Sequence, residues 1–119
     1  MPTAKVYRWD DLPIDSPMAK VERRRVIGQQ MMISQIFLHR GFRVPSHHHV
    51  NEQFTVVLSG VVRFGLGQEG SAEHHVVDVR AGEVLHLPSE VWHSAEAIED
   101  AHLFDLFSPP SERTGIDER

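Results

Sequence analysis

Cysteine is absent from the 119 residues, which excludes disulfides, thiolate metal sites, iron–sulfur clusters and cysteine nucleophiles. Any bound metal must therefore be held by histidine, carboxylate or amide side chains. Long apolar runs are also absent: no segment approaches the roughly 20 residues that span a bilayer, and the N-terminal sequence lacks the apolar region of a signal peptide. We therefore expect a cytoplasmic protein with no membrane partner.

Positive charge is scarce. Twelve basic residues stand against 17 acidic ones, which gives a formal net charge of −5 at pH 7. An acidic surface repels phosphate backbones, so nucleic acid is not expected as a partner. The apolar share of 40% and the charged share of 24% are ordinary for a globular protein, and the length suits one domain.

Sustained helical periodicity is missing as well, and short runs rich in Val, Ile and Phe alternate with turn residues from Val21 onward. The expected strands are Glu22–Ile27, Met32–His39, Phe54–Leu58, Val61–Leu66, His75–Val79, Glu83–Leu87, Ser94–Ile98 and His102–Phe107. Tight breaks such as Ser59-Gly60 and Arg80-Ala81-Gly82 favour an antiparallel meander. The sequence predicts an all-β fold, a single-domain antiparallel β-barrel.

Both ends of the chain differ from this pattern. Residues 1–20 are expected to be an extended arm or edge strand, because Pro13 and Pro17 exclude a helix through them. The barrel should cover residues 21–108, and residues 109–119 should form a surface tail that could cover a barrel mouth. The segment Val6-Tyr7-Arg8-Trp9 is apolar on one parity without an obvious partner in its own chain, which predicts a homodimer.

Histidine is abundant, with nine copies, three of which are consecutive at His47, His48 and His49. An extended backbone sends His47 and His49 to one face and His48 to the other. Two imidazoles at this spacing can occupy adjacent positions on a metal ion. Continued alternation keeps Gln53 on the same face and turns Glu52 away. His93, far along the chain after a proline-led turn, could close the site across the barrel.

These residues resemble the two motifs of the cupin superfamily, G-x5-H-x-H-x3 or x4-E-x6-G and G-x5-P-x-G-x2-H-x3-N. The first motif matches Gly41, His47, His49, Gln53 and Gly60, and the second matches Gly82, Pro88 and His93. Three positions depart from it: Gln53 replaces Glu, Glu90 replaces Gly and Ala97 replaces Asn. The resemblance implies a double-stranded β-helix, the jelly-roll barrel of that superfamily.

The segments His47 to Gln53 and Phe104 to Pro110 are similar to the small single-domain cupins of the pectin-degradation family. That resemblance implies three histidines and one glutamine, here His47, His49, His93 and Gln53, on one divalent metal. It implies ring opening of unsaturated uronates, with Asp105 as the catalytic aspartate and Phe107 in the substrate pocket. The family's arginine after the double proline is Ser111 here, and Arg113 follows two residues later.

Asp105 is also notable in its own right, because it interrupts an apolar strand and shares the parity of Leu103 and Phe107. A carboxylate there must be paired, hydrogen-bonded or pocket-lining, and we expect it to transfer a proton. The other histidines carry no such signal: no function is assigned to His48, His74 or His75, while the direction of His86 stays open. The run Arg23-Arg24-Arg25 is typical of a solvated edge strand, although one arginine could point to a substrate carboxylate.

Three imidazoles and an amide bring no negative charge, so a bound divalent ion keeps its full charge, acts as a Lewis acid and favours small anionic molecules. We expect a sugar-acid isomerase or lyase. An Fe- or Mn-dependent oxidoreductase of the dioxygenase kind and a non-catalytic small-molecule binder remain alternatives. Ni, Zn, Fe, Co and Mn all suit this ligand set.

Overall fold

The computed structural model describes residues 2–111. Within them lie the 3-10 turn η1 (Trp9–Asp11) and nine strands. The strands are β1 (Val21–Ile27), β2 (Met32–Leu38), β3 (Arg43–His47), β4 (Glu52–Ser59), β5 (Val61–Leu66), β6 (His75–Arg80), β7 (Val84–Leu87), β8 (His93–Ala97) and β9 (Ala101–Ser108). The sequence indicated eight of them and treated β3 only as extended backbone. None of the helical segments in the described residues has the length and hydropathy needed to cross a bilayer.

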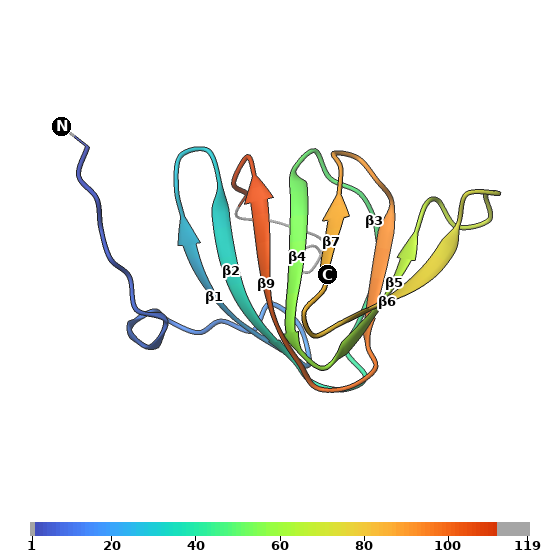
Figure 1. The fold of residues 1–119 in the computed structure, drawn as a ribbon, viewed down its shortest axis with the longest axis horizontal. Helices are drawn as coiled ribbons and strands as arrows, with labels where there is room; N and C mark the ends of the chain where they lie inside the picture. Colours follow the sequence, from blue (N-terminus) through green and yellow to red (C-terminus); the bar gives the residue numbers. More distant parts are fainter. Residues whose placement is uncertain (1, 112–119) are drawn as a thin grey trace.

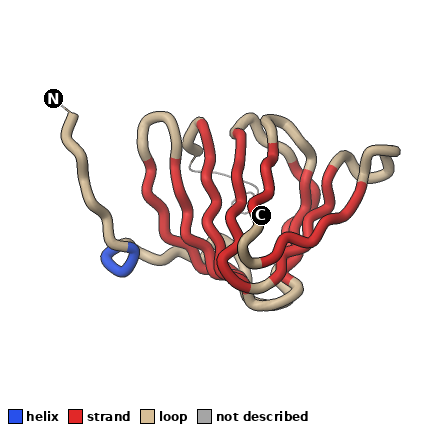
Figure 2. Tube along the Cα trace, viewed as in Figure 1, coloured by secondary structure: helices blue, strands red, loops and turns tan. Residues whose placement is uncertain are grey.

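The strands form two antiparallel sheets that face each other, as Figures 1 and 2 show. One sheet has the order β1-β2-β9-β4-β7, and the other has the order β3-β8-β5-β6. The jelly-roll arrangement expected from the sequence is therefore confirmed. Each strand places alternate side chains between the sheets and on the outer surface, so inward positions are fixed by parity.

The meander inferred from the tight breaks is wrong. The link at Ser59-Gly60 joins β4 to β5, but β4 pairs with β7 and β9, whereas β5 pairs with β6 and β8. Gly60 has a φ of +82°, and a Cβ there would lie 2.2 Å from the carbonyl oxygen of Asp100, so only glycine fits. The turn carries the chain from one sheet to the other. Turn residues alone do not show whether the two strands that they join pair with each other or belong to different sheets.

The register across β1, β2 and β9 arranges the inward side chains in rows. Val21, Leu38 and Ala101 are neighbours at one end, and all three are buried in the apolar core. Met32 and Phe107 are paired at the other end. Between these rows, Ser34 lies opposite Asp105. The polar pair of Ser34 and Asp105 thus lies between two apolar rows.

The N-terminal arm extends away from the barrel (Figure 1). Val6 is 96% exposed and Tyr7 is 52% exposed. Trp9 differs from the expectation that this segment lacks a partner in its own chain: its ring stacks on Phe104 of β9 at a centroid distance of 5.7 Å. The 3-10 turn at Trp9 brings the indole back against the outer face of the sheet.

Candidate functional site

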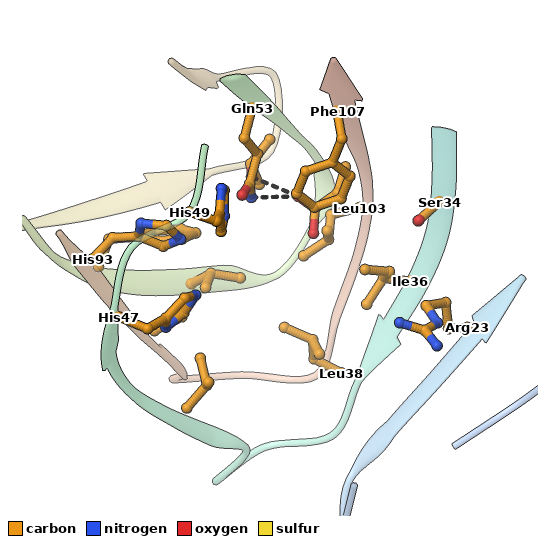
Figure 3. A pocket seen from close by; sticks show the side chains of 16 residues that line it. Arg23, Ser34, Ile36, Leu38, His47, His49, Gln53, His93, Leu103 and Phe107 are labelled. Carbon is orange, nitrogen blue, oxygen red and sulfur yellow. Dashed lines mark hydrogen bonds between the residues drawn. The ribbon is translucent and has the colours of Figure 1, made fainter. Parts of the chain in front are cut away.

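A pocket lies between the two sheets (Figure 3). Its polar lining residues are Arg23, Ser34, His47, His49, Gln53, Thr55, His93 and Asp105, and its apolar ones are Ile36, Leu38, Val44, Val62, Phe64, Ala95, Leu103 and Phe107. All six residues singled out in the sequence as metal-binding, catalytic or substrate-contacting therefore line one cavity.

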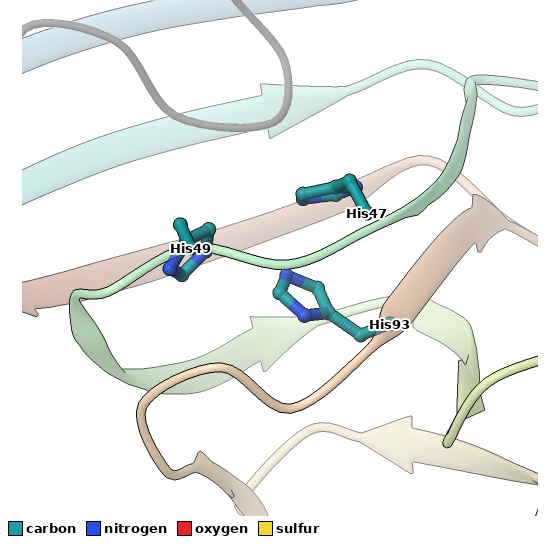
Figure 4. Close-up of side chains that lie close together, drawn as sticks. All are labelled: His47, His49 and His93. Carbon is teal, nitrogen blue, oxygen red and sulfur yellow. The ribbon is translucent and has the colours of Figure 1, made fainter.

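The three pocket histidines come from two places in the chain and converge (Figure 4). His47 ends β3, His49 follows in the loop before β4, and His93 begins β8, opposite His47 in register. The ring centroids of His47 and His93 are 4.3 Å apart, and those of His49 and His93 are 5.0 Å apart. One nitrogen of each ring lies within 4.8 Å of the other two.

Each of these imidazoles is held by the same kind of hydrogen bond. Nδ1 of His47 lies 2.8 Å from the Pro45 carbonyl, Nδ1 of His49 lies 3.0 Å from the Asn51 carbonyl, and Nδ1 of His93 lies 2.9 Å from the Val91 carbonyl. A carbonyl oxygen only accepts, so Nδ1 carries the proton and Nε2 keeps its lone pair. In metal-binding histidines, a hydrogen bond from the ring nitrogen that does not bind the metal fixes the tautomer in this way.

Burial also supports the assignment of these histidines as metal ligands through Nε2. Nε2 of His49 is buried and has no hydrogen-bond partner among the described residues, which is the expected state of a ligand atom. Burial lowers the pKa of His93 to about 4, against the hydrogen bond to Val91, and the neighbouring His47 and His49 lower it further. His93 is therefore neutral near pH 7. The donor set fits a divalent cation of the kind that prefers imidazole.

Gln53 is buried on β4, while its neighbour Glu52 points outward, as the alternation predicts. The Gln53 Nε2 group donates to Thr55 Oγ1 at 2.9 Å and to Asp105 Oδ1 at 3.3 Å. Because the amide nitrogen faces these acceptors, the amide oxygen is the Gln53 atom that is available to a cation.

Asp105 lies on the inner face of β9 and forms hydrogen bonds to two side chains of β4. Its Oδ1 accepts from Thr55 Oγ1 at 2.6 Å and from Gln53 Nε2 at 3.3 Å. Burial raises the pKa of Asp105 to about 6, although both hydrogen bonds lower it. Part of its surface still faces the pocket, so the carboxyl changes charge close to neutral pH within reach of a ligand.

Phe107 is two residues further along the same face of β9. Its ring stands edge-on to His49, with centroids 5.8 Å apart and planes at 69°. The shared parity of Leu103, Asp105 and Phe107 is confirmed, since all three line the pocket. Phe107 thus packs against a candidate ligand and presents an apolar surface beside it.

Two further histidines, His48 and His86, point away from the pocket. His48 contacts Glu90 at 3.1 Å and packs on Trp92, which confirms its outward direction. His86, whose direction the sequence left open, contacts Glu52 at 2.6 Å and stacks on Phe54 on the outer surface. Arg113, which follows the double proline, lies outside the described residues.

One arginine of the run at residues 23–25 differs from the solvated face that the sequence favours and follows the alternative of an inward arginine. Arg23 is 3% exposed and lines the pocket. The signal that reveals it is the parity of β1: Val21 is buried, and Arg23 is the next residue on that face. A run of three arginines conceals this alternation, because inward and outward positions carry the same residue type.

A family model described as a cupin domain matches residues 35–107, more than half of the chain. The chain belongs to the cupin family. The matched segment includes all three pocket histidines, Gln53 and Asp105. No curated protein matches this cupin.

Solved structures share its fold. KdgF from Halomonas sp. superposes with a TM-score of 0.80 and 22% identity over 92% of this chain and 97% of that one. An RmlC-like cupin from Shewanella frigidimarina has a TM-score of 0.80 and 20% identity over 92% and 95% of the two chains. A single-residue variant of the oxalate decarboxylase of Bacillus subtilis gives a TM-score of 0.80 at 19% identity; the match covers 97% of this chain and 33% of that one. At these identities the likeness concerns the fold.

Proposed function

We propose that this cupin is a metal-dependent enzyme that opens the ring of unsaturated uronates without net oxidation or reduction. The observation that carries the proposal is the position of Asp105. A carboxyl whose pKa is raised to about 6 lines the same pocket as three histidines, one ring nitrogen of each lying within 4.8 Å of the other two. This combination suits a reaction in which a proton moves beside a bound oxygen atom.

His47, His49 and His93 would hold the cation through Nε2, and the amide oxygen of Gln53 would be its fourth ligand. A divalent ion bound there would supply a Lewis acid that polarises substrate oxygens. The Nδ1 hydrogen bonds to backbone carbonyls keep the three rings in place before the cation arrives. Phe107, edge-on to His49, would contact the substrate ring and exclude water from this side.

Asp105 would carry the proton. In the cyclic substrate, Asp105 takes the proton of the anomeric hydroxyl, and the bond between the anomeric carbon and the ring oxygen breaks to give an aldehyde. The ring oxygen leaves as an enolate, and Asp105 returns the proton to the adjacent alkene carbon, so the enolate becomes a ketone. Atoms and electrons balance within the substrate. Thr55 and Gln53 both donate to Oδ1, which directs Oδ2 to this task.

The test is an assay of the metal-loaded protein with an unsaturated uronate monomer, followed through loss of the ultraviolet absorbance of the conjugated double bond. Asp105→Asn should retain its metal and lose turnover by ~10²–10⁴-fold, the usual contribution of general acid–base catalysis. Turnover close to that of the wild type in this variant would rule out Asp105 as the proton carrier.

The second candidate is an oxidoreductase that uses Fe or Mn. It is favoured by the fold shared with oxalate decarboxylase of Bacillus subtilis, one structure of which is described by its Mn(II) centres. Elemental analysis followed by oxygen-uptake measurements separates the two reactions. Oxygen consumption without ring opening would favour the oxidoreductase, and ligand binding without either reaction would favour a non-catalytic binder.

The exposed N-terminal arm supports a homodimer. Val6 and Tyr7 project from the barrel, and β1, next to the arm, is an edge strand of its sheet. Exposed apolar side chains on the arm favour contact with a second copy. Sedimentation of the wild type and of a variant with Val6→Ser and Tyr7→Ser should show a dimer and a monomer, respectively. A cytoplasmic location remains a prediction from the sequence.

A further inference from the structure

We propose that Arg23 is an anion-binding residue of this pocket and takes the carboxylate of a ring-sized acid whose other end faces the histidines. The inference rests on the proposed function for the reaction, but the binding that it describes can be measured without any reaction. It assigns a role to the one arginine among the described residues that lines the pocket.

The partly exposed Asp15 holds the guanidinium of Arg23 in position. Its Nε donates to Asp15 Oδ1 at 3.0 Å, and its Nη2 donates to Asp15 Oδ2 at 2.7 Å. Two parallel hydrogen bonds from one edge of the guanidinium fix the plane of the group. Two backbone hydrogen bonds also join the residues: Arg23 N–H donates to the Asp15 carbonyl at 2.8 Å, and Asp15 N–H donates to the Arg23 carbonyl at 2.9 Å. These bonds fix the position of the pair.

The charge of this pair is distributed unevenly. The side chain of Asp15 is 47% exposed, whereas that of Arg23 is 3% exposed. Water screens the carboxylate of Asp15, while the guanidinium lies next to the pocket in a medium of lower dielectric constant. Water thus weakens the field of the Asp15 carboxylate in the pocket more than the field of the buried guanidinium. Arginine is suited to a carboxylate because its planar fork matches the two oxygens.

The width of the sheet sets the size of the ligand. In the order β1-β2-β9-β4, three strand spacings separate Arg23 from Gln53, about 14 Å along the sheet at about 4.8 Å per strand. The inward residues between them include Ile36 and Leu103, which present carbon to the face of a ring. A two-carbon acid is much shorter than this span, so an acid that contacts both ends must be at least as large as a six-membered ring with a carboxylate.

The adjacent Arg24 offers a matched control. It lies on the same strand and points to the other face, where Nε donates to the Leu12 carbonyl at 3.3 Å and Nη1 donates to Gln35 Oε1 at 3.2 Å. Arg23→Gln and Arg24→Gln remove the same charge from neighbouring positions. Arg23→Lys keeps the charge and removes the fork, so it also shows whether loss of binding in Arg23→Gln comes from misfolding.

The experiment is calorimetric titration of the metal-free protein with D-galacturonate, a saturated uronate that the proposed reaction cannot consume, and with D-galactose, which lacks the carboxylate. Arg23→Gln should weaken galacturonate binding by about tenfold or more, the contribution of a charge-assisted hydrogen bond. Arg23→Lys should give an intermediate loss, and Arg24→Gln should bind as the wild type does. Galactose binding should be the same in all four proteins.

Several results would overturn the inference: no galacturonate binding by the wild type at millimolar concentrations, equal loss in the Arg23 and Arg24 variants, or equal loss of galactose binding in Arg23→Gln. The proposed function fails separately. If the metal-loaded wild type opens no uronate but the Arg23-dependent binding of galacturonate is found, the anion site stands and the reaction is wrong. If ring opening occurs and its KM is unchanged in Arg23→Gln, the reaction stands and the anion site is wrong.

Discussion

Thr55 on β4 and Asp105 on β9 are paired in register, and the Thr55 hydroxyl donates a 2.6 Å hydrogen bond to Asp105 Oδ1. This contact favours the ionised carboxyl, as does the longer one from Gln53, but burial prevails and the pKa of Asp105 is raised to about 6. Thr55 therefore affects both the direction of the carboxyl and its acidity. It also accepts a hydrogen bond from Gln53, so it joins the candidate metal ligand to the candidate proton carrier.

Thr55→Val should raise the pKa of Asp105 further, because the largest interaction that favours its ionised form is lost while the volume is kept. Carbon-13 NMR titration of the aspartate carboxyls in the metal-free protein measures this change. Thr55→Ser, which keeps the hydroxyl, should leave the pKa near that of the wild type. The same pKa in the Val and Ser variants would show that Thr55 does not set it.

Asp105→Asn should stabilise the metal-free protein near pH 7. Folding raises the pKa of this acid from 3.8 to about 6, so the folded state binds the proton more tightly. The contribution of the protonated Asp105 to the stability of the wild type is fully present below pH 4 and is lost as the pH rises through about 6. At neutral pH the ionised group costs on the order of 2–3 kcal/mol, which asparagine does not incur. Asparagine can still accept both hydrogen bonds at Oδ1.

The measurement is the difference in the free energy of unfolding between Asp105→Asn and the wild type, from chemical denaturation at several pH values between 4 and 8. The lowered pKa of His93 makes stability rise with pH between about 4 and 6.5, but His93 is present in both proteins and its contribution cancels. A difference that does not grow with pH across this range would contradict the raised pKa of Asp105.

His49→Ala should abolish binding of the divalent metal while the barrel remains folded, because the core consists of Val, Ile, Leu and Phe side chains away from this loop. His48→Ala is the control, since the adjacent imidazole contacts Glu90 and Trp92 on the surface. Metal stoichiometry by elemental analysis, together with far-ultraviolet circular dichroism, tests both variants. Unchanged stoichiometry in His49→Ala would remove the site as described.

Gln53→Ala should weaken metal binding less than any single histidine replacement, because a neutral amide oxygen is a poorer donor than an imidazole nitrogen. Dissociation constants from competition with a chelator give this ranking. An effect as large as that of His49→Ala would make Gln53 a full ligand. No effect would limit Gln53 to its hydrogen bonds with Thr55 and Asp105.

Glu90→Gly should be more stable than Glu90→Ala by about 1 kcal/mol, because residue 90 has a φ of +69°, where a Cβ is strained. Both variants lose the contact between the Glu90 carboxylate and His48, so the comparison isolates the backbone. Thermal unfolding of the two proteins at one pH measures the difference. Equal stability would show that the turn relaxes when the side chain is shortened.

Much of the candidate site followed from alternation along single strands. The shared direction of His47 and His49 and the inward direction of Asp105 follow a period of two. A register shift between Val44 and His47 and bends at Val50 and Asn51 bring the histidines and Gln53 to the same pocket, and alternation alone does not explain them. Turn residues were equally informative about where the chain reverses, as at Gly60, whose positive φ and contact with Asp100 leave no room for a side chain. Local rules were sufficient wherever the neighbouring residues along one strand determine the outcome.

Alternation failed where residue type did not change along the strand. Arg23, Arg24 and Arg25 look alike in the sequence, and only the packing of β1 against β2 turns Arg23 into the pocket. Trp9 was similarly unreadable, because its partner Phe104 lies almost a full chain length away. The contact between Trp9 and Phe104 has no local signal.

The all-β class, the cupin resemblance, the candidate metal-binding residues and the inward carboxyl could all be predicted from the sequence, because strand parity and motif spacing are local properties. The folded chain was needed to show that β4 pairs with β7 and β9 and that His93 begins β8 opposite His47. The same holds for the hydrogen bonds from Thr55 and Gln53 that lower the pKa of Asp105, and for the position of Arg23 in the same cavity. These relationships depend on which strands become neighbours, and that choice is made by burial of the whole apolar surface at once, so no short segment contains it.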